Sequence, residues 1–323
     1  MTQHFSFPVE RIFYKVQEDL PKAFTVGLSD GFEKGLRHEI NLVDRDGCIT
    51  TVAEVSPSGQ VSLSVAYCQF LLLICHIGYI IHESIAVDSA LERMSDDEKE
   101  EYYKELEIDC QLTRFLREIP SFEKAKEYCS RLIDTAKPLL QHRPLSVEEF
   151  EALCRDVSYD SELAGRANSL CVYGIIFTLL HEASHVILGQ NLRERGSVQE
   201  EIEADNNAFW ALWGDLEGKE RNTAMMGCLC SLASLLFLNP TLEPDENDPH
   251  PREDSRLFSF YDILKDEKTS YTEMLVFLLI TWATVVGEEN FPILSVSYQH
   301  TLESQRAYLS RIGNDDSTEK ARV

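Results

Sequence analysis

Residues 181–185 read HEASH, a pattern that is typical of zinc hydrolases when it lies on a helix. Four residues advance a helix by about 6 Å and return to nearly the same face, so His181 and His185 can bind one metal ion together. Glu182 lies beside them, where a carboxylate can act as general base on a water molecule. The motif therefore predicts a hydrolytic metal site.

The flanking sequence predicts the helix that this spacing requires. An apolar run occupies 170–180, Asp160 or Ser161 can cap the start, and Gly189 can end the helix. The alternative is an amphipathic helix with two buried histidines that bind no metal. Burying two imidazoles and a carboxylate within one turn would cost several kcal/mol unless a cation paired with them. We therefore favour the metal site.

A second acidic segment supplies a candidate third ligand. Ser197 and Glu200 form an S-x-x-E capping box, which predicts the start of a second helix. Glu201 and Asp205 share a face of this helix, so Glu201 could bind the metal while Asp205 accepts a hydrogen bond from a ligand imidazole. Glu203 is the alternative ligand, but it lies roughly 200° around the helix from Glu201. Two histidines and one carboxylate leave a coordination position for water, as in catalytic zinc sites.

A third element follows an acidic, proline-rich loop. Residues 248–256 read DPHPREDSR and predict the start of another helix. His250 beside a metal site could donate a hydrogen bond to the oxyanion that forms when water attacks a carbonyl, and Arg256 could assist. The alternative is a loop histidine and a surface arginine, and the spacing favours neither interpretation over the other.

The chain resembles the glutamate-zincin metallopeptidases, and in particular the Lit-type phage-exclusion peptidases, in three motifs that follow one another in the same order. They are HEASH, EEIEAD, and HP with an arginine six residues after the histidine. The similarity covers most of the chain beyond residue 60. It implies a zinc ion with three protein ligands, His181, His185 and Glu201. It also implies that Glu182 is the general base and that Asp205 orients a ligand. His250 and Arg256 would then lie at the substrate carbonyl.

The resemblance further implies an activity, the cleavage of an intracellular protein during phage infection, with a translation elongation factor as the precedent. An activating partner or a phage-derived trigger would accompany it. A different class of function is a non-catalytic zincin-fold sensor or regulatory binding module, although such a module would not need the carboxylate of Glu182 beside the metal. A third alternative is a zinc hydrolase for a small amide, which would require a closed pocket rather than an elongated groove.

The composition excludes several classes of protein. The 323 residues are 44% hydrophobic, enough for a real core, and 30 basic against 55 acidic residues give a net charge of −25. This charge argues against a surface for nucleic acid or anionic membranes. The nine cysteines are scattered and contain no C-x-x-C pair, so we expect them to be reduced. The chain opens without a secretory pattern, which predicts a cytoplasmic protein.

Two apolar segments raise the question of a membrane. The segment at 61–81 contains Ser62, Gln69 and His76, and the segment at 274–286 is too short to span a bilayer. We expect both to be buried helices of a protein that does not enter a membrane.

Together these patterns predict an α+β fold with a mostly α-helical, zincin-like core. Residues 1–65 contain β-branched runs and turn signals, so we expect a small N-terminal sheet region packed on that core. A helical peptidase domain should occupy 66–312, and the polar tail at 313–323 is expected to be disordered. Apolar segments at 223–238 and 271–286 should pack as helices behind the zinc-binding ones.

Overall fold

A computed structural model describes most of the chain beyond residue 51. The described residues are 20, 28–38, 40–43, 52–91, 94–98, 122–141, 143–146, 148–150, 152–153, 161–190, 197–239, 242, 251–264, 267, 269–293 and 297–320. Two positions to which the sequence gives a role, Asp160 and His250, lie outside these residues. Most of the charged segment at 88–118 also lies outside them.

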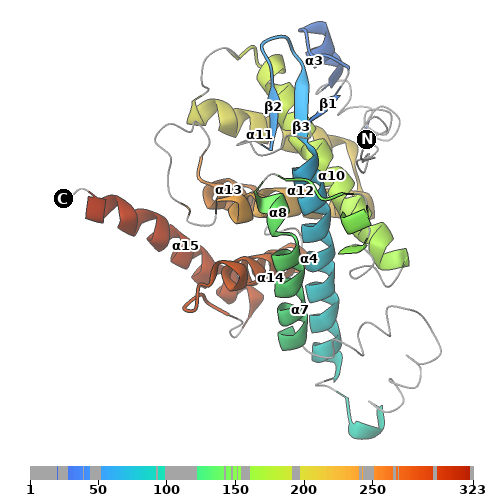
Figure 1. Cartoon of the computed structure of the whole chain (residues 1–323), viewed down its shortest axis with the longest axis vertical. Helices are drawn as coiled ribbons and strands as arrows, with labels where there is room; N and C mark the ends of the chain where they lie inside the picture. Colours follow the sequence, from blue (N-terminus) through green and yellow to red (C-terminus); the bar gives the residue numbers. More distant parts are fainter. Residues whose placement is uncertain are drawn as a thin grey trace.

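A small sheet lies near the N-terminus, next to the short helix α3 (Asp30–Glu33) (Figure 1). Strand β3 (Val61–Ser64) is central; it pairs in parallel with β1 (Ile40–Val43) and antiparallel with β2 (Ala53–Val55). The turn between β2 and β3 requires glycine, because Gly59 has φ +75° and a Cβ there would lie 1.9 Å from the carbonyl oxygen of Gly35. The sheet and the predominance of helices confirm the predicted α+β class.

The apolar segment at 61–81 is divided between two elements. Its first four residues form β3, and helix α4 (Val65–Leu91) follows without a linker. Helix α4 is buried over most of its described length and contacts α7 (Phe122–Thr135) and α8 (Lys137–Leu140). It also contacts three of the helices described below, and these contacts place α4 inside the helical core.

The HEASH motif lies near the end of α10 (Ser161–Ile187), as its flanking sequence predicts. Helix α10 packs against α4, α11 (Val198–Asp215) and α12 (Gly218–Leu238). The approach of α10 to α12 is close, because a Cβ on Gly227 would lie 2.5 Å from the carbonyl oxygen of Leu170. Helix α10, which carries the motif, is therefore packed against neighbouring helices on several sides.

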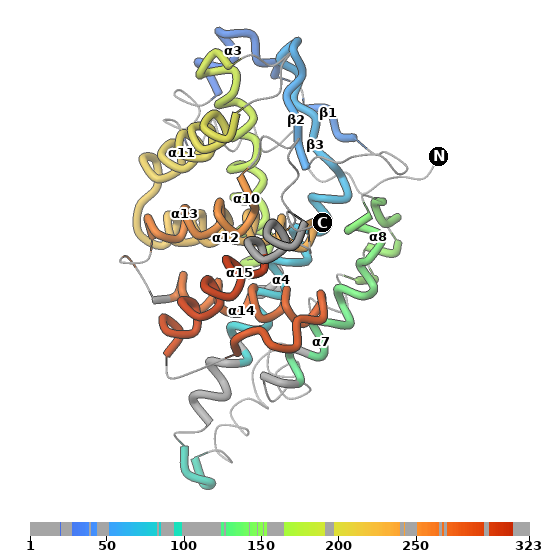
Figure 2. Tube along the Cα trace, turned by 90° about the vertical axis from the view of Figure 1, so that its left-hand side faces the viewer, coloured from blue at the N-terminus to red at the C-terminus, as the bar shows by residue number. Residues whose placement is uncertain are grey.

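The remaining helices complete the molecule on the side away from the sheet. Figures 1 and 2 show the sheet, α3 and α11 toward one end, α12 and α13 (Glu253–Leu264) in the middle, and α14 (Thr269–Val286) and α15 (Tyr298–Lys320) toward the other. Helix α15 continues to Lys320, into the segment for which the polar composition predicts disorder. Polar residues disfavour burial, but many of them are good helix formers, so a polar tail can extend a helix.

Within the described residues, three helical stretches are long and apolar enough to cross a membrane, judged by length and composition alone. They are Val65–His82, Gly165–Ile187 and Gly218–Leu238, of which 89%, 78% and 67% is buried inside the protein. Their apolar side chains therefore already pack against one another and against neighbouring helices.

Candidate metal centre

Three side chains from two helices meet at one point. His181 and His185 come from α10 and Glu201 from α11, and their potential ligand atoms all lie within 4.8 Å of one another. The two Nε2 atoms are 3.2 Å apart, and Glu201 Oε2 lies 3.2 Å from His181 Nε2. Glu201 Oε1 lies 3.7 Å from His185 Nε2. A tetrahedral zinc centre with bonds of about 2.0–2.1 Å separates its ligand atoms by roughly 3.3–3.4 Å, so the cluster has the size of such a centre.

Hydrogen bonds behind the rings orient both imidazoles. Asp205 Oδ1 lies 2.9 Å from Nδ1 of His181, and Oε1 of Gln190 lies at hydrogen-bonding distance from Nδ1 of His185. A carboxylate and an amide oxygen can only accept, so each Nδ1 carries a proton, and each Nε2 is the nitrogen whose lone pair can bind a metal ion in place of a second proton. Both lone pairs are then available to the same metal ion.

Gln190 is a site residue that the sequence motifs do not single out. Helix α10 ends at Ile187, Gly189 reverses the chain with a φ of +69°, and the backbone N–H of Gln190 returns to the carbonyl oxygen of His185 over 3.0 Å. Its side chain also donates to the backbone carbonyl of Glu200 over 3.3 Å. The signal in the sequence is the glycine directly after the motif helix, because this turn brings the next residue back to the second histidine.

Replacing Gln190 by leucine should weaken metal binding without unfolding the protein. The Gln190→Leu side chain keeps a similar size but cannot accept the proton of His185 Nδ1, and loss of such an outer partner lowers metal affinity by about 10- to 100-fold. Competition with a chelator of known affinity measures the change. Gln199→Leu is the matched control, since Gln199 lies exposed on α11 and bonds Glu203 over 3.0 Å. Equal affinities in the two variants would contradict this role of Gln190.

The acidic residues of α11 lie on two different faces of the helix, as the helix period predicts. The capping box is present, with Ser197 accepting from the backbone N–H of Glu200. Glu201 is buried and faces the histidines, whereas Glu203 is exposed and bonds Gln199. The structure therefore does not bring the alternative ligand Glu203 to the cluster. A further link between α10 and α11 is the 2.9 Å hydrogen bond from Asn207 to the buried hydroxyl of Ser184.

Arg256 lies against Asp205, not at the Nε2 side of the histidines. Its guanidinium forms a two-pronged ion pair, with Nε 2.9 Å from Oδ2 and Nη2 2.8 Å from Oδ1 of Asp205. Asp205 in turn bonds His181, so the ion pair connects Arg256 to that imidazole. The resemblance implied a place for Arg256 at the substrate carbonyl; the structure shows its contact with Asp205, and a contact with substrate stays a prediction. His250, the other half of that pair, lies outside the described residues.

The electrostatics of the site favour a positive charge at His181. Burial raises the pKa of Asp205, but the charges of Arg256 and His181 lower it more, so the carboxyl stays ionised well below its usual range. Burial lowers the pKa of His181, but the charge and hydrogen bond of Asp205 and a hydrogen bond to Glu201 outweigh burial and raise this pKa to about 9. The ligands are also buried, with His181 5% and Glu201 4% exposed. A buried cluster that attracts a proton so strongly also suits a cation held by the two Nε2 atoms and Glu201.

The end of α10 is held by the N-terminal region. The ammonium group of Lys34, just after α3, donates to the carbonyl oxygen of Ile187 over 2.6 Å. A cation at a helix C-terminus satisfies an unpaired carbonyl group and interacts favourably with the helix dipole. Ile187 is only two residues beyond His185, so this contact fixes the turn of the helix that carries the second histidine.

Comparison with known families gives one match. Residues 66–276 match the family model described as Peptidase U49. The chain belongs to the Peptidase U49 family. No curated protein and no solved structure matches it. The part of this U49 chain that matches contains both α10 and α11, and therefore the whole cluster, together with Arg256 on α13. Membership supports a peptidase function and agrees with the peptidase family that the motifs resemble.

Proposed function

We propose that this protein is a zinc-dependent endopeptidase. The observation that carries the proposal is the meeting of two imidazole nitrogens and one carboxylate at tetrahedral spacing, with both rings fixed in the tautomer that binds metal, in a member of a peptidase family. Nitrogen ligands with one carboxylate are typical of catalytic zinc, whereas closed structural sites use four protein ligands, most of them cysteine. This set leaves room for water.

Glu182 is the proposed general base. It follows His181 directly on α10 and is 8% exposed, so it lies on the catalytic helix in a site largely shielded from solvent. A bound zinc ion would acidify the attacking water and polarise the scissile carbonyl. Glu182 accepts the proton of that water and then delivers it to the leaving amine. His250 is proposed to donate a hydrogen bond to the oxyanion, and Asp205 and Gln190 hold the two imidazoles in place.

Two features favour a polypeptide over a small amide as substrate. Strand β2 is an edge strand of the described sheet and contacts α10, and an extended peptide can add to such an edge by backbone hydrogen bonds. In addition, an open pocket lies between α11 and α13 beside Asp205. An elongated groove with side-chain pockets is what a peptidase needs, while a small amide is held in an enclosed cavity.

The resemblance to the Lit-type peptidases extends the proposal to the cellular role. We propose a cytoplasmic enzyme that cuts an intracellular protein of the elongation-factor type during phage infection, with a phage-derived trigger or an activating partner. The acidic net charge of −25 agrees with a protein substrate rather than a nucleic acid.

Incubation with a purified elongation factor and with a cytosolic extract, with and without a zinc chelator, tests the proposal. A defined new fragment should appear, should be absent with the chelator, and should return when zinc is restored. Mass spectrometry of the new termini identifies the bond. If the protein binds zinc with both imidazoles coordinated but yields no fragment in any substrate mixture, the proposed peptidase is wrong and a zinc-stabilised binding module replaces it.

A further inference from the structure

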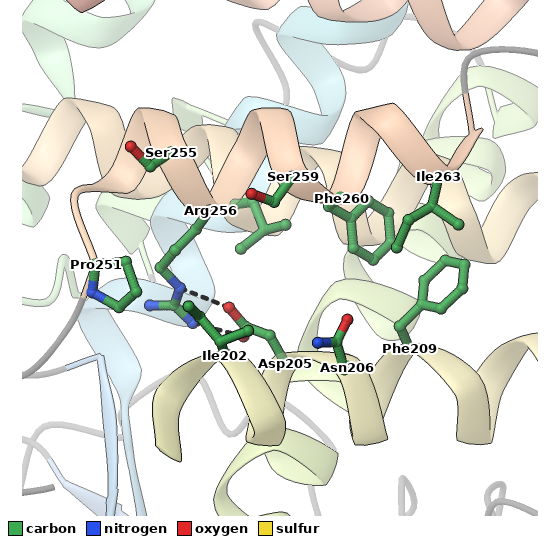
Figure 3. Close-up of a pocket in the computed structure, with 11 residues that line it drawn as sticks. Ile202, Asp205, Asn206, Phe209, Pro251, Ser255, Arg256, Ser259, Phe260 and Ile263 are labelled. Atoms are coloured by element: carbon green, nitrogen blue, oxygen red, sulfur yellow. Dashed lines mark hydrogen bonds and ion pairs between the residues drawn. The ribbon is translucent and has the colours of Figure 1, made fainter. Parts of the chain in front are cut away.

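An open pocket of about 140 Å³ lies between helices α11 and α13 (Figure 3). Its apolar part is lined by Ile202, Phe209, Leu232, Phe260 and Ile263. Figure 3 shows Phe209, Phe260 and Ile263 gathered at one end, while Arg256 and Asp205 face each other at the opposite end. The pocket therefore combines an apolar chamber with a polar end.

The polar end of the pocket is shared with the metal centre. Asp205 lines the pocket and also contacts Nδ1 of His181 over 2.9 Å, and the Nε2 of the same ring faces Glu201. One imidazole ring and one hydrogen bond thus separate the pocket from the ligand atoms. An extended peptide advances about 3.3–3.6 Å per residue, so a substrate residue within about two positions of the bond being cut can reach this pocket.

The charges at the polar end exclude charged side chains. Asp205 and Arg256 neutralise each other in a two-pronged ion pair, so a basic side chain finds no free acid there and an acidic one competes with Asp205 for the arginine. Desolvating a charge against Phe209 and Phe260 would add a further cost. An uncharged, apolar group is the occupant that fits.

The size and the rim of the pocket point to the same occupant. A cavity of about 150 Å³ lined by leucine, isoleucine and phenylalanine accepts benzene, so this pocket has room for a leucine, isoleucine, methionine or phenylalanine side chain. Ile202 and Ile263 at the rim are each 39% exposed. Val198 and Trp210 lie in the same row of α11 at multiples of four residues from Ile202, at 48% and 55% exposure, with the polar residue Asn206 between Ile202 and Trp210. Exposed apolar surface of this kind beside a reactive centre is typical of a binding groove.

We propose that this pocket between α11 and α13 receives a large apolar side chain of the peptide substrate and so determines where the chain cuts. The inference rests on the proposed peptidase function and names its substrate class, a polypeptide with an apolar residue within two positions of the cleaved bond. Ile202 and Ile263 determine specificity, and the ion pair of Asp205 with Arg256 forms the end wall.

Binding of two zinc-directed probes tests the pocket without any cleavage. Glycine hydroxamate carries no side chain, whereas leucine hydroxamate carries an isobutyl group; both have the same amino group and the same zinc-binding hydroxamate atoms. The zinc-loaded wild-type protein should bind leucine hydroxamate at least about tenfold more tightly, since a buried isobutyl group contributes more than 1.4 kcal/mol. Ile263→Trp should fill the pocket and abolish this difference while zinc content and glycine hydroxamate affinity stay the same.

The matched control is Ile293→Trp, because Ile293 is 53% exposed on a different part of the surface. A second blocking variant, Ser259→Trp, starts from another exposed residue that lines the pocket and guards against a folding defect in the first. A preference for leucine hydroxamate that survives both blocking variants would overturn the proposal, as would equal affinity of the wild type for the two probes. Failure of both probes to bind the wild-type protein would instead overturn the metal centre, and with it the inference that rests on it.

Cleavage of a peptide library, read by mass spectrometry, supplies the second test. Wild-type and Ile293→Trp proteins should cut with an excess of large apolar residues at one position near the bond, and Ile263→Trp should cut those peptides about tenfold more slowly or more. An unchanged preference in Ile263→Trp would contradict the proposal. If the hydroxamate difference is present but no peptide is cut, the pocket stands as a binding site and the peptidase function fails.

Discussion

Glu182→Gln is expected to keep zinc bound and to lose peptide cleavage by at least about 100-fold, the range of effects for a positioned general base. Glutamine has the shape of glutamate but cannot accept a proton from the attacking water, so only the proton transfer is removed. The three proposed ligands, which could hold a metal ion, are His181, His185 and Glu201, and none of them changes. Single-turnover cleavage measures the rate, and atomic absorption or a colorimetric chelator measures the zinc.

The matched control for this variant is Glu203→Gln, which makes the same chemical change at an exposed glutamate of α11. Its rate and zinc content should equal those of the wild type. A Glu182→Gln protein that cuts at the wild-type rate would remove Glu182 from the mechanism. The same variant, if inactive but still able to bind substrate, is the natural trap with which to isolate the target.

Glu201→Gln is expected to cause the largest loss of metal. It removes the only negative charge among the three ligands, so zinc affinity should fall by more than the roughly 10- to 100-fold of an outer-partner change. Binding of zinc to the native state alone stabilises a protein by about 2.7 kcal/mol at 100 times the dissociation constant. Zinc should therefore raise the melting temperature of the wild-type protein and leave that of Glu201→Gln unchanged over the same concentrations.

Glu203→Gln serves again as the control, since it should respond to zinc as the wild type does. The melting temperatures without zinc show whether the variant itself folds, because the substitution is of equal size at a buried position. A Glu201→Gln protein that binds zinc as tightly as the wild type would eliminate Glu201 as a ligand. Glu203 would not replace it, because its side chain lies on the exposed face of the helix.

The core of the candidate site follows from helix periodicity, and the structure brings together the residues that this periodicity selects. Residues four apart share a face, which places His181 above His185 on one helix and Glu201 above Asp205 on the next. The capping box at Ser197 fixes where the second helix begins and therefore which of its faces turns inward. These are local rules, so one sequence is enough to apply them.

The contacts between distant segments could not be predicted in this way. The partner of Arg256 is Asp205, 51 residues earlier, and the spacing of Arg256 from His250 carries no information about it. Gln190 reaches His185 only through the turn at Gly189, and the pocket exists only where α11 and α13 lie side by side. Contacts of this kind depend on how helices pack, which sequence periodicity does not specify.

The predicted fold class holds, but the boundaries of single elements were harder to predict. The segment at 61–81 is apolar almost throughout, and a buried strand and a buried helix give the same continuous pattern, so this pattern alone does not mark the change from β3 to α4 at residue 65. The β-branched runs and turn signals before residue 65 are what indicate a sheet there. In the polar tail, a helix continues where the sequence pattern does not predict one. A polar segment lacks the apolar face that marks a packed helix, yet α15 runs on to Lys320 as a continuation of a helix that begins in the core.

The direct passage from β3 into α4 connects the sheet to the helical core, because α4 packs against α10, which carries the two histidines. Leu63 in β3 is fully buried, and Lys34 supports the end of α10 from a region that precedes the residues shared with the family. Deleting the first 64 residues would therefore remove the elements that pack on this end of α10 and the hydrogen bond from Lys34 to the carbonyl oxygen of Ile187. We therefore expect the smallest active form of the protein to be longer than residues 66–276, because its N-terminal region supports the helix that carries two of the proposed ligands, His181 and His185.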